Sequence, residues 1–77
     1  MKLYRIVEPG EKQTLRTAIG KQVEVKLENG SVLAGRIADV DSSTLVLDID
    51  DNVGGGTVSF TDEVPLSTVR WIKIWED

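Results

Sequence analysis

The fold of this chain is decided by residues 22–48, QVEVKLENGSVLAGRIADVDSSTLVLD. This stretch opens with the period-two alternation of a half-buried strand, in which polar residues separate Val23, Val25 and Leu27. Asn29-Gly30 follows, and this pair tolerates the positive φ values of a two-residue type I′ turn. We therefore expect a β-hairpin here.

The second arm of this hairpin is a longer strand that contains Gly35. A glycine inside a strand allows a sharp bend or the close approach of another backbone. A strand bent in this way can serve both halves of a small barrel. Asp41-Ser42-Ser43 is typical of the next turn, and one more strand is predicted by alternating Leu45, Leu47 and Ile49.

The flanking segments extend this pattern to a whole domain. Residues 1–10 are expected to form an N-terminal arm or an extra strand, and residues 11–19 suit a short helix with an apolar face of Leu15, Ala18 and Ile19. Residues 50–56 predict a flexible loop or a hairpin tip, and further strands are expected at 57–64 and 70–75.

The predicted fold class is therefore mainly β, in one domain over residues 1–77. It has a short N-terminal helix followed by a strongly bent five-stranded antiparallel small barrel at residues 21–75. Short strands joined by tight turns favour this meander.

The composition argues against catalysis. The chain has no Cys and no His, which excludes disulfides, thiolate or imidazole zinc sites and histidine general bases. Residues 48–52 begin like a calcium loop, but Val53 stands where its turn glycine belongs. The glycines at 54–56 lack the Lys-Ser/Thr of a phosphate-binding loop. We expect no enzyme, cofactor, metal or small-molecule substrate.

The charge is unevenly distributed along the chain. The net charge is −4, yet residues 1–36 carry seven Lys/Arg against four Asp/Glu, and residues 37–77 carry two against nine. This predicts a basic side and an acidic side if the halves occupy different faces. No apolar run approaches the roughly 18 residues of a membrane span, and the N-terminus lacks the apolar core of a signal peptide, so we expect a cytoplasmic location.

Two short motifs in the chain resemble those of a known family. The first is an apolar strand, a turn with Asn29-Gly30, a bend at Gly35, then Asp41 and a brief strand; the second is Leu66-Ser67-Thr68-Val69 followed by Ile72 and Ile74. Together they resemble the two motifs of the Sm and Sm-like family, whose bacterial host-factor branch has a similar Leu/Ile-Ser-Thr-Val sequence. The chain looks like a divergent member.

The resemblance implies a ring. Family members pair the fourth barrel strand of one subunit with the fifth of the next, here residues 57–64 with 70–75, which gives a closed homo-oligomer of about five to seven subunits. The residues expected at that interface are Val58, Phe60, Trp71, Ile72 and Trp75. Two otherwise free strand edges would be satisfied in this way.

The resemblance also implies binding of single-stranded RNA, in an RNA-binding or RNA-chaperone role. Cationic side chains would contact phosphates, and the turn after Asp41 would line the pore. The residues expected to bind are Lys12, Arg16, Lys21, Arg36, Asp41, Ser42, Ser43, Thr44 and Arg70.

Departures from the motifs leave an alternative open. Ser42-Ser43-Thr44 stand where RNA-binding relatives place an aromatic or apolar residue and an Asn. The alternative is a ring-forming structural or protein-interaction module without nucleic-acid binding. Trp71 and Trp75 could stack on bases, although burial at the interface or in the core is the favoured interpretation.

Overall fold

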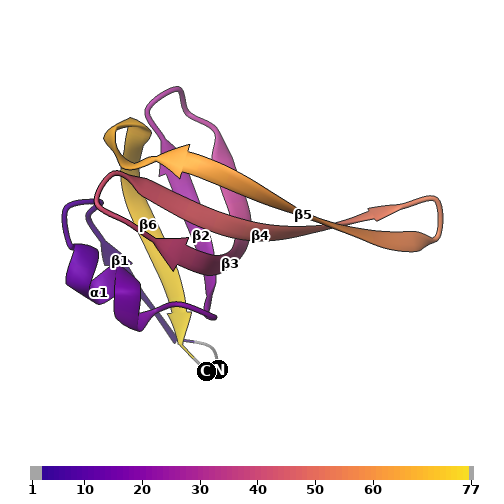
Figure 1. The fold of residues 1–77 in the computed structure, drawn as a ribbon, viewed down its shortest axis with the longest axis horizontal. Coiled ribbons are helices and arrows are strands. Elements are labelled where there is room, and N and C mark those ends of the chain that lie inside the picture. The colour runs from indigo at the N-terminus through magenta and orange to yellow at the C-terminus, as the bar shows by residue number, and fades with distance from the viewer. Residues whose placement is uncertain (1–2, 77) are drawn as a thin grey trace.

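The computed structural model describes residues 3–76, and their side chains except those of 51–53. It consists of one antiparallel sheet of six strands in the order β1-β6-β2-β3-β4-β5 (Figure 1). The strands are β1 (Leu3–Val7), β2 (Gln22–Leu27), β3 (Val32–Val40), β4 (Thr44–Val53), β5 (Gly56–Pro65) and β6 (Val69–Glu76). Helix α1 (Lys12–Thr17) follows β1, and the 3-10 helix η1 (Leu66–Thr68) precedes β6. The mainly β class is confirmed.

The expectation that a helix is the first element and that the sheet has five strands is wrong. The first element is strand β1, which pairs antiparallel with β6 in a register that places Tyr4 opposite Trp75 and Val7 opposite Ile72. Val7 is buried, whereas the other β1 residues are exposed. The strand is too short for its own periodicity to identify it, and it is ordered by a partner at the other end of the chain.

Helix α1 is shorter than predicted because the chain turns immediately after it. The Ala18 amide donates to the Leu15 carbonyl oxygen, the Lys21 amide donates to that of Ala18, and Gly20 has a φ of +92°. Leu15 and Ala18 are fully buried against the sheet, as expected from their spacing, but Ile19 is 46% exposed. Ile19 follows Ala18, the C-cap of α1, where the chain turns toward β2, so it does not share their face.

The turn at Asn29-Gly30 is not the predicted two-residue type I′ turn. Only Gly30 has a positive φ, of +92°. The Gly30 amide donates to the Leu27 carbonyl oxygen, and the Leu27 amide donates to that of Ser31, which makes a three-residue loop with a glycine bulge. The Asn29 side chain accepts a hydrogen bond from the Ser31 amide at 2.9 Å. This bond stabilises the turn while Asn29 keeps a negative φ.

The glycine-rich segment forms a tight hairpin tip. Val53 pairs with Gly56, so Gly54 and Gly55 make a two-residue loop between β4 and β5. Their φ values of +58° and +84° are those of a type I′ turn. The long β4–β5 hairpin projects well beyond the rest of the sheet (Figure 1).

Strand β3 connects the two halves of the sheet. Residues 32–36 pair with β2, and residues 36–40 pair with β4, with an irregularity around Ala38. Gly35 lies where the partner changes, and β4 approaches its backbone closely there. The curved sheet encloses an apolar core whose fully buried larger side chains are Leu15, Val23, Val25, Ile37, Leu45, Leu47, Ile72 and Ile74.

Candidate nucleic-acid interface

The turn between β3 and β4 is built around the carboxylate of Asp41. Its Oδ1 accepts hydrogen bonds from the amides of Ser43 at 2.8 Å and Thr44 at 2.7 Å. These bonds hold the pKa of Asp41 below its usual value, first through Ser43 and then through Thr44, and the positive charge of Lys12 on α1 acts in the same direction. The turn is therefore fixed by Oδ1 of its own aspartate.

This turn is joined to η1. The Leu66 amide donates to the Ser43 carbonyl oxygen at 2.9 Å, and Thr44 pairs with Pro65. We call residues 41–44 and 66–68 the turn pair. The two motifs that resemble the Sm family meet here. Its exposed side chains are mainly hydroxyl groups, those of Ser42, Ser43, Ser67 and Thr68.

Few of the predicted cations lie at the turn pair. Lys12 lies within electrostatic range of Asp41, and Arg70 follows η1 at an irregularity in the β2–β6 ladder. Arg16 is exposed on α1. Lys21 and Arg36 belong to another site, described next.

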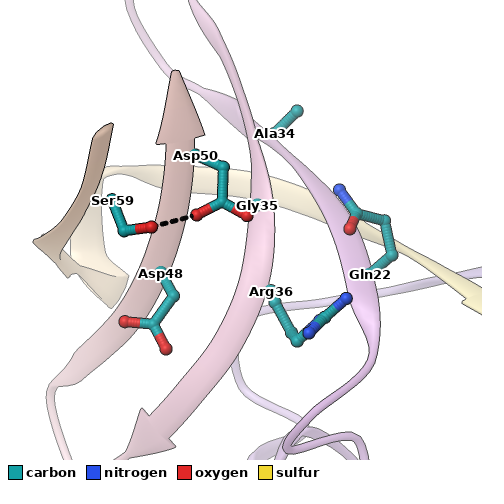
Figure 2. Close-up of a pocket in the computed structure, with 7 residues that line it drawn as sticks. All are labelled: Gln22, Ala34, Gly35, Arg36, Asp48, Asp50 and Ser59. Carbon is teal, nitrogen blue, oxygen red and sulfur yellow. Dashed lines mark hydrogen bonds between the residues drawn. The ribbon is translucent and has the colours of Figure 1, made fainter. Parts of the chain in front are cut away.

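Arg36 lies on the outer face of the sheet, the face turned away from the core. It lines a hollow of about 460 Å³ with Gln22, Ala34, Gly35, Asp48, Asp50 and Ser59 (Figure 2). Figure 2 shows the Arg36 side chain turned toward Gln22 and away from Asp48. The two carboxylates are held by β5: Ser59 Oγ donates to Asp50 at 2.6 Å, and Thr61 Oγ1 donates to Asp48 at 3.3 Å.

Arg36 also borders a second hollow with Lys21. This hollow, of about 370 Å³, is lined by Gly20, Lys21, Gln22, Arg36, Trp75 and Glu76. Lys21 Nζ lies 3.6 Å from a Glu76 carboxylate oxygen, and that carboxylate is also paired with Arg5 at 3.0 Å. Two predicted phosphate ligands therefore converge beside a tryptophan, away from the turn pair.

Sequence reasoning missed an aromatic cluster on the same face. Tyr4 packs edge-on against Trp75, with ring centroids 5.2 Å apart. Lys73 Nζ lies 4.6 Å from the Tyr4 ring centroid, 5.5 Å from that of Trp75 and 6.0 Å from that of Trp71. The alternation of Trp71, Lys73 and Trp75 was visible in the sequence, whereas the placement of Tyr4 depends on β1 pairing with β6.

The residues predicted at the oligomer interface are dispersed. Val58 and Phe60 are about half exposed on β5, at one end of the sheet. Ile72 is fully buried in the core, so it is not part of any surface of the chain. Trp71 and Trp75 lie partly buried on β6. Strand β6 pairs with β2 on one side, and its residues 72–76 pair with β1 on the other, so only residues 69–71 of the second edge are left for a neighbouring copy. The predicted pairing of residues 57–64 with 70–75 does not fit this sheet.

Other site types find no support among residues 3–76. Among the side chains that the structure describes, those of residues 3–50 and 54–76, no group of three or more His, Cys, Asp or Glu is placed to hold a metal ion. No helix in that range is long and apolar enough to cross a membrane. Comparison with protein-family models, with curated proteins and with solved structures gives no match.

Proposed function

We propose that this chain is a self-associating Sm-like barrel module that forms a closed homo-oligomeric ring and binds single-stranded RNA. The observation that carries the proposal is the state of the two strands at the ends of the sheet. Strand β1 pairs only with β6 and β5 only with β4 among the described residues, and both carry exposed apolar side chains. Unpaired strand edges of this kind are templates for pairing with another chain.

The free edges of β5 and β1 both carry apolar side chains on the side of the sheet that faces the core. Phe60 and Val58 on β5 project to the same side as buried Val64, and Leu3 on β1 projects to the same side as buried Val7. Pairing of β5 with β1 of the next copy would therefore set Phe60 and Leu3 on one continuous apolar surface. We call this contact the seam. It replaces the pairing through β6 that the family resemblance implies.

Closure into a ring follows from the kind of contact. The contact joins two different surfaces of the chain. An open assembly therefore keeps a free β1 edge at one end and a free β5 edge at the other, and another copy can add at either end. Such a contact makes either a ring or an open filament, and about five to seven curved copies would close. Burial of edge strands would also stabilise a domain whose small size limits its own core.

In the proposed ring, RNA binds at the turn pair of each subunit. Support comes from the direct hydrogen bond between Leu66 and Ser43, which unites the two motif segments, and from Lys12 and Arg70 as phosphate contacts. Repetition around a ring would multiply a weak site through multivalency. The second candidate is a ring that binds only proteins, which the absence of any aromatic residue from the turn pair favours.

The ring is tested by light scattering after size exclusion across a range of concentrations. We expect one mass of several subunits for the natural sequence and a monomer for Phe60→Lys, because a charge at the seam would be desolvated. Ile19→Lys is the matched control, since Ile19 is 46% exposed on no sheet edge and its variant should retain the oligomer. A monomer at every concentration of the natural sequence would refute the proposed ring.

The RNA role is tested by fluorescence anisotropy with labelled oligo-U and oligo-A. Salt-sensitive binding is expected, and Lys12→Gln combined with Arg70→Gln should weaken it if the turn pair holds the strand. Absence of any anisotropy change at micromolar protein in low salt, together with an intact ring, would favour the second candidate.

A further inference from the structure

The outer face carries a second cluster of side chains suited to nucleic acid. We call Tyr4, Trp71, Lys73 and Trp75 the aromatic platform. Three of the four aromatic residues of the chain gather here, and Tyr4 is 53% exposed. The platform spans the paired strands β1 and β6, so its rings sit on rigid elements and not on a loop.

The platform adjoins the hollow that Lys21 and Arg36 line. Trp75 belongs to both, because it contacts Tyr4 on one side and borders the hollow on the other. A strand that stacked a base on these rings would therefore meet two cations next to its backbone. This combination of π faces and a cationic groove is how proteins bind single strands.

The charge around the rings supports a polyanion. The side chains nearby are the cations Arg5, Lys21, Lys26, Arg36 and Lys73 and the carboxylates Glu24 and Glu76, a local balance of +3 in a chain of net −4. Both carboxylates are already paired, Glu24 with Lys73 at 3.8 Å and Glu76 with Arg5 at 3.0 Å. Asp48 and Asp50 line the first hollow with Arg36, where hydroxyls of β5 hold them.

We infer that the aromatic platform and the Lys21–Arg36 hollow together form a binding site for single-stranded nucleic acid, in which bases stack on Tyr4 and Trp75 while Lys21 and Arg36 contact phosphates. The inference rests on the proposed nucleic-acid role and adds to the contact at the turn pair a second, stronger contact on the outer face. Pairing of β1 with a neighbouring copy through its backbone leaves this face open, so a ring would carry one such site per subunit.

The test compares three variants in anisotropy titrations with labelled oligo-U. Tyr4→Ala removes one stacking ring and should weaken binding roughly fivefold to 150-fold. Lys21→Gln with Arg36→Gln should weaken binding and reduce the slope of log affinity against log salt by about 1.4, the value for two phosphate contacts. Lys12→Gln with Arg70→Gln removes the same charge from the turn pair, and its loss of affinity is expected to be smaller than that of the Lys21/Arg36 variant.

A second readout comes from intrinsic fluorescence. Both tryptophans of the chain belong to the platform, so stacking should quench tryptophan emission with the same affinity that anisotropy reports. Unlabelled oligo-dT separates DNA from RNA as the source of the strand, and quenching by either supports the site. A duplex of equal length should bind weakly, because its bases are already stacked; equal binding would overturn the stacking geometry.

The outcomes separate this inference from the proposed function. Loss of binding only in the Lys12/Arg70 variant, with Tyr4→Ala unaffected, would overturn the platform and leave the proposed function standing. Loss in the Tyr4 and Lys21/Arg36 variants, with the ring intact, supports the platform. Absence of binding by the natural sequence overturns the platform together with the RNA role. The proposed ring is then tested only by the mass that light scattering measures.

Discussion

Gly35 of β3 lies directly against the backbone of Asp48 on β4. A Cβ atom placed on Gly35 would be 2.7 Å from the Asp48 carbonyl oxygen and 3.1 Å from Cγ1 of Ile49. Backbone atoms cannot move aside as the end of a flexible side chain can. The two strands therefore approach closely at the point where β3 changes partner, and a glycine is required there.

Gly35→Ala is expected to lower the free energy of unfolding by about 1–3 kcal/mol, because the added methyl group forces β3 away from β4. Urea denaturation followed by circular dichroism measures this change. Gly10→Ala is the matched control: no atom lies within 4 Å of its Cβ position, and its φ is not positive. Equal stability of the two variants would show that the close approach is absent in solution.

Leu15→Ala should cost about 2–5 kcal/mol, since this fully buried side chain attaches α1 to the sheet. Ile19→Ala should change the unfolding free energy by less than about 0.5 kcal/mol, because Ile19 is largely exposed beyond the helix. Thermal and urea unfolding of the pair distinguish them. Similar losses would place Ile19 on the buried face that its sequence spacing predicts.

Gly30→Ala should destabilise the β2–β3 hairpin by about 1–2 kcal/mol, because its φ of +92° is costly for a side chain with a Cβ. Gly30→Asn should cost less, since Asn tolerates left-handed backbone better. The comparison of their urea midpoints is the measurement. A larger loss for Asn than for Ala would contradict this account of the turn.

Asp41 should contribute a pH-dependent part of the stability. Its folded-state pKa lies below the ordinary value of 3.8. The contribution is therefore fully present well above pH 3.8 and is lost as the pH falls through the lower, folded-state pKa. Asp41→Asn keeps an acceptor oxygen for the turn but does not titrate, so the natural sequence should be the more stable at pH 7 and lose that advantage in acid.

Thermal melts of both proteins from pH 7 to pH 2.5 check this prediction. The difference in melting temperature should shrink toward the acid end. A difference that stays constant over the whole range would mean that the Asp41 carboxylate has the same pKa in the folded and unfolded chains.

Much of the secondary structure was predictable because its signals are local. The alternation of Val23, Val25 and Leu27 identified β2, and the spacing of Leu15 and Ala18 identified the buried face of α1. Turn positions were also visible, although their types were not. Asn29-Gly30 adopts a glycine-bulge loop, and the type I′ geometry occurs at Gly54-Gly55, because the strand register on either side selects the turn.

The candidate sites were only partly predictable. The cations Lys21 and Arg36 and the turn after Asp41 were identified, and the structure places them in two separate sites. Tyr4 and Lys73 were not identified. Their neighbours are set by strand pairing between distant segments, for which a single sequence carries no local signal.

Residue types and their short-range order thus determined that the chain forms a mainly β domain, that it contains no Cys and no His, and where its turns fall. Tertiary structure alone decided that β1 pairs with residues 72–76 of β6. It also decided that Tyr4, Lys21, Arg36 and Trp75 share one face. The physical reason is that alternation fixes which side of a strand a residue occupies, whereas long-range pairing fixes its neighbours.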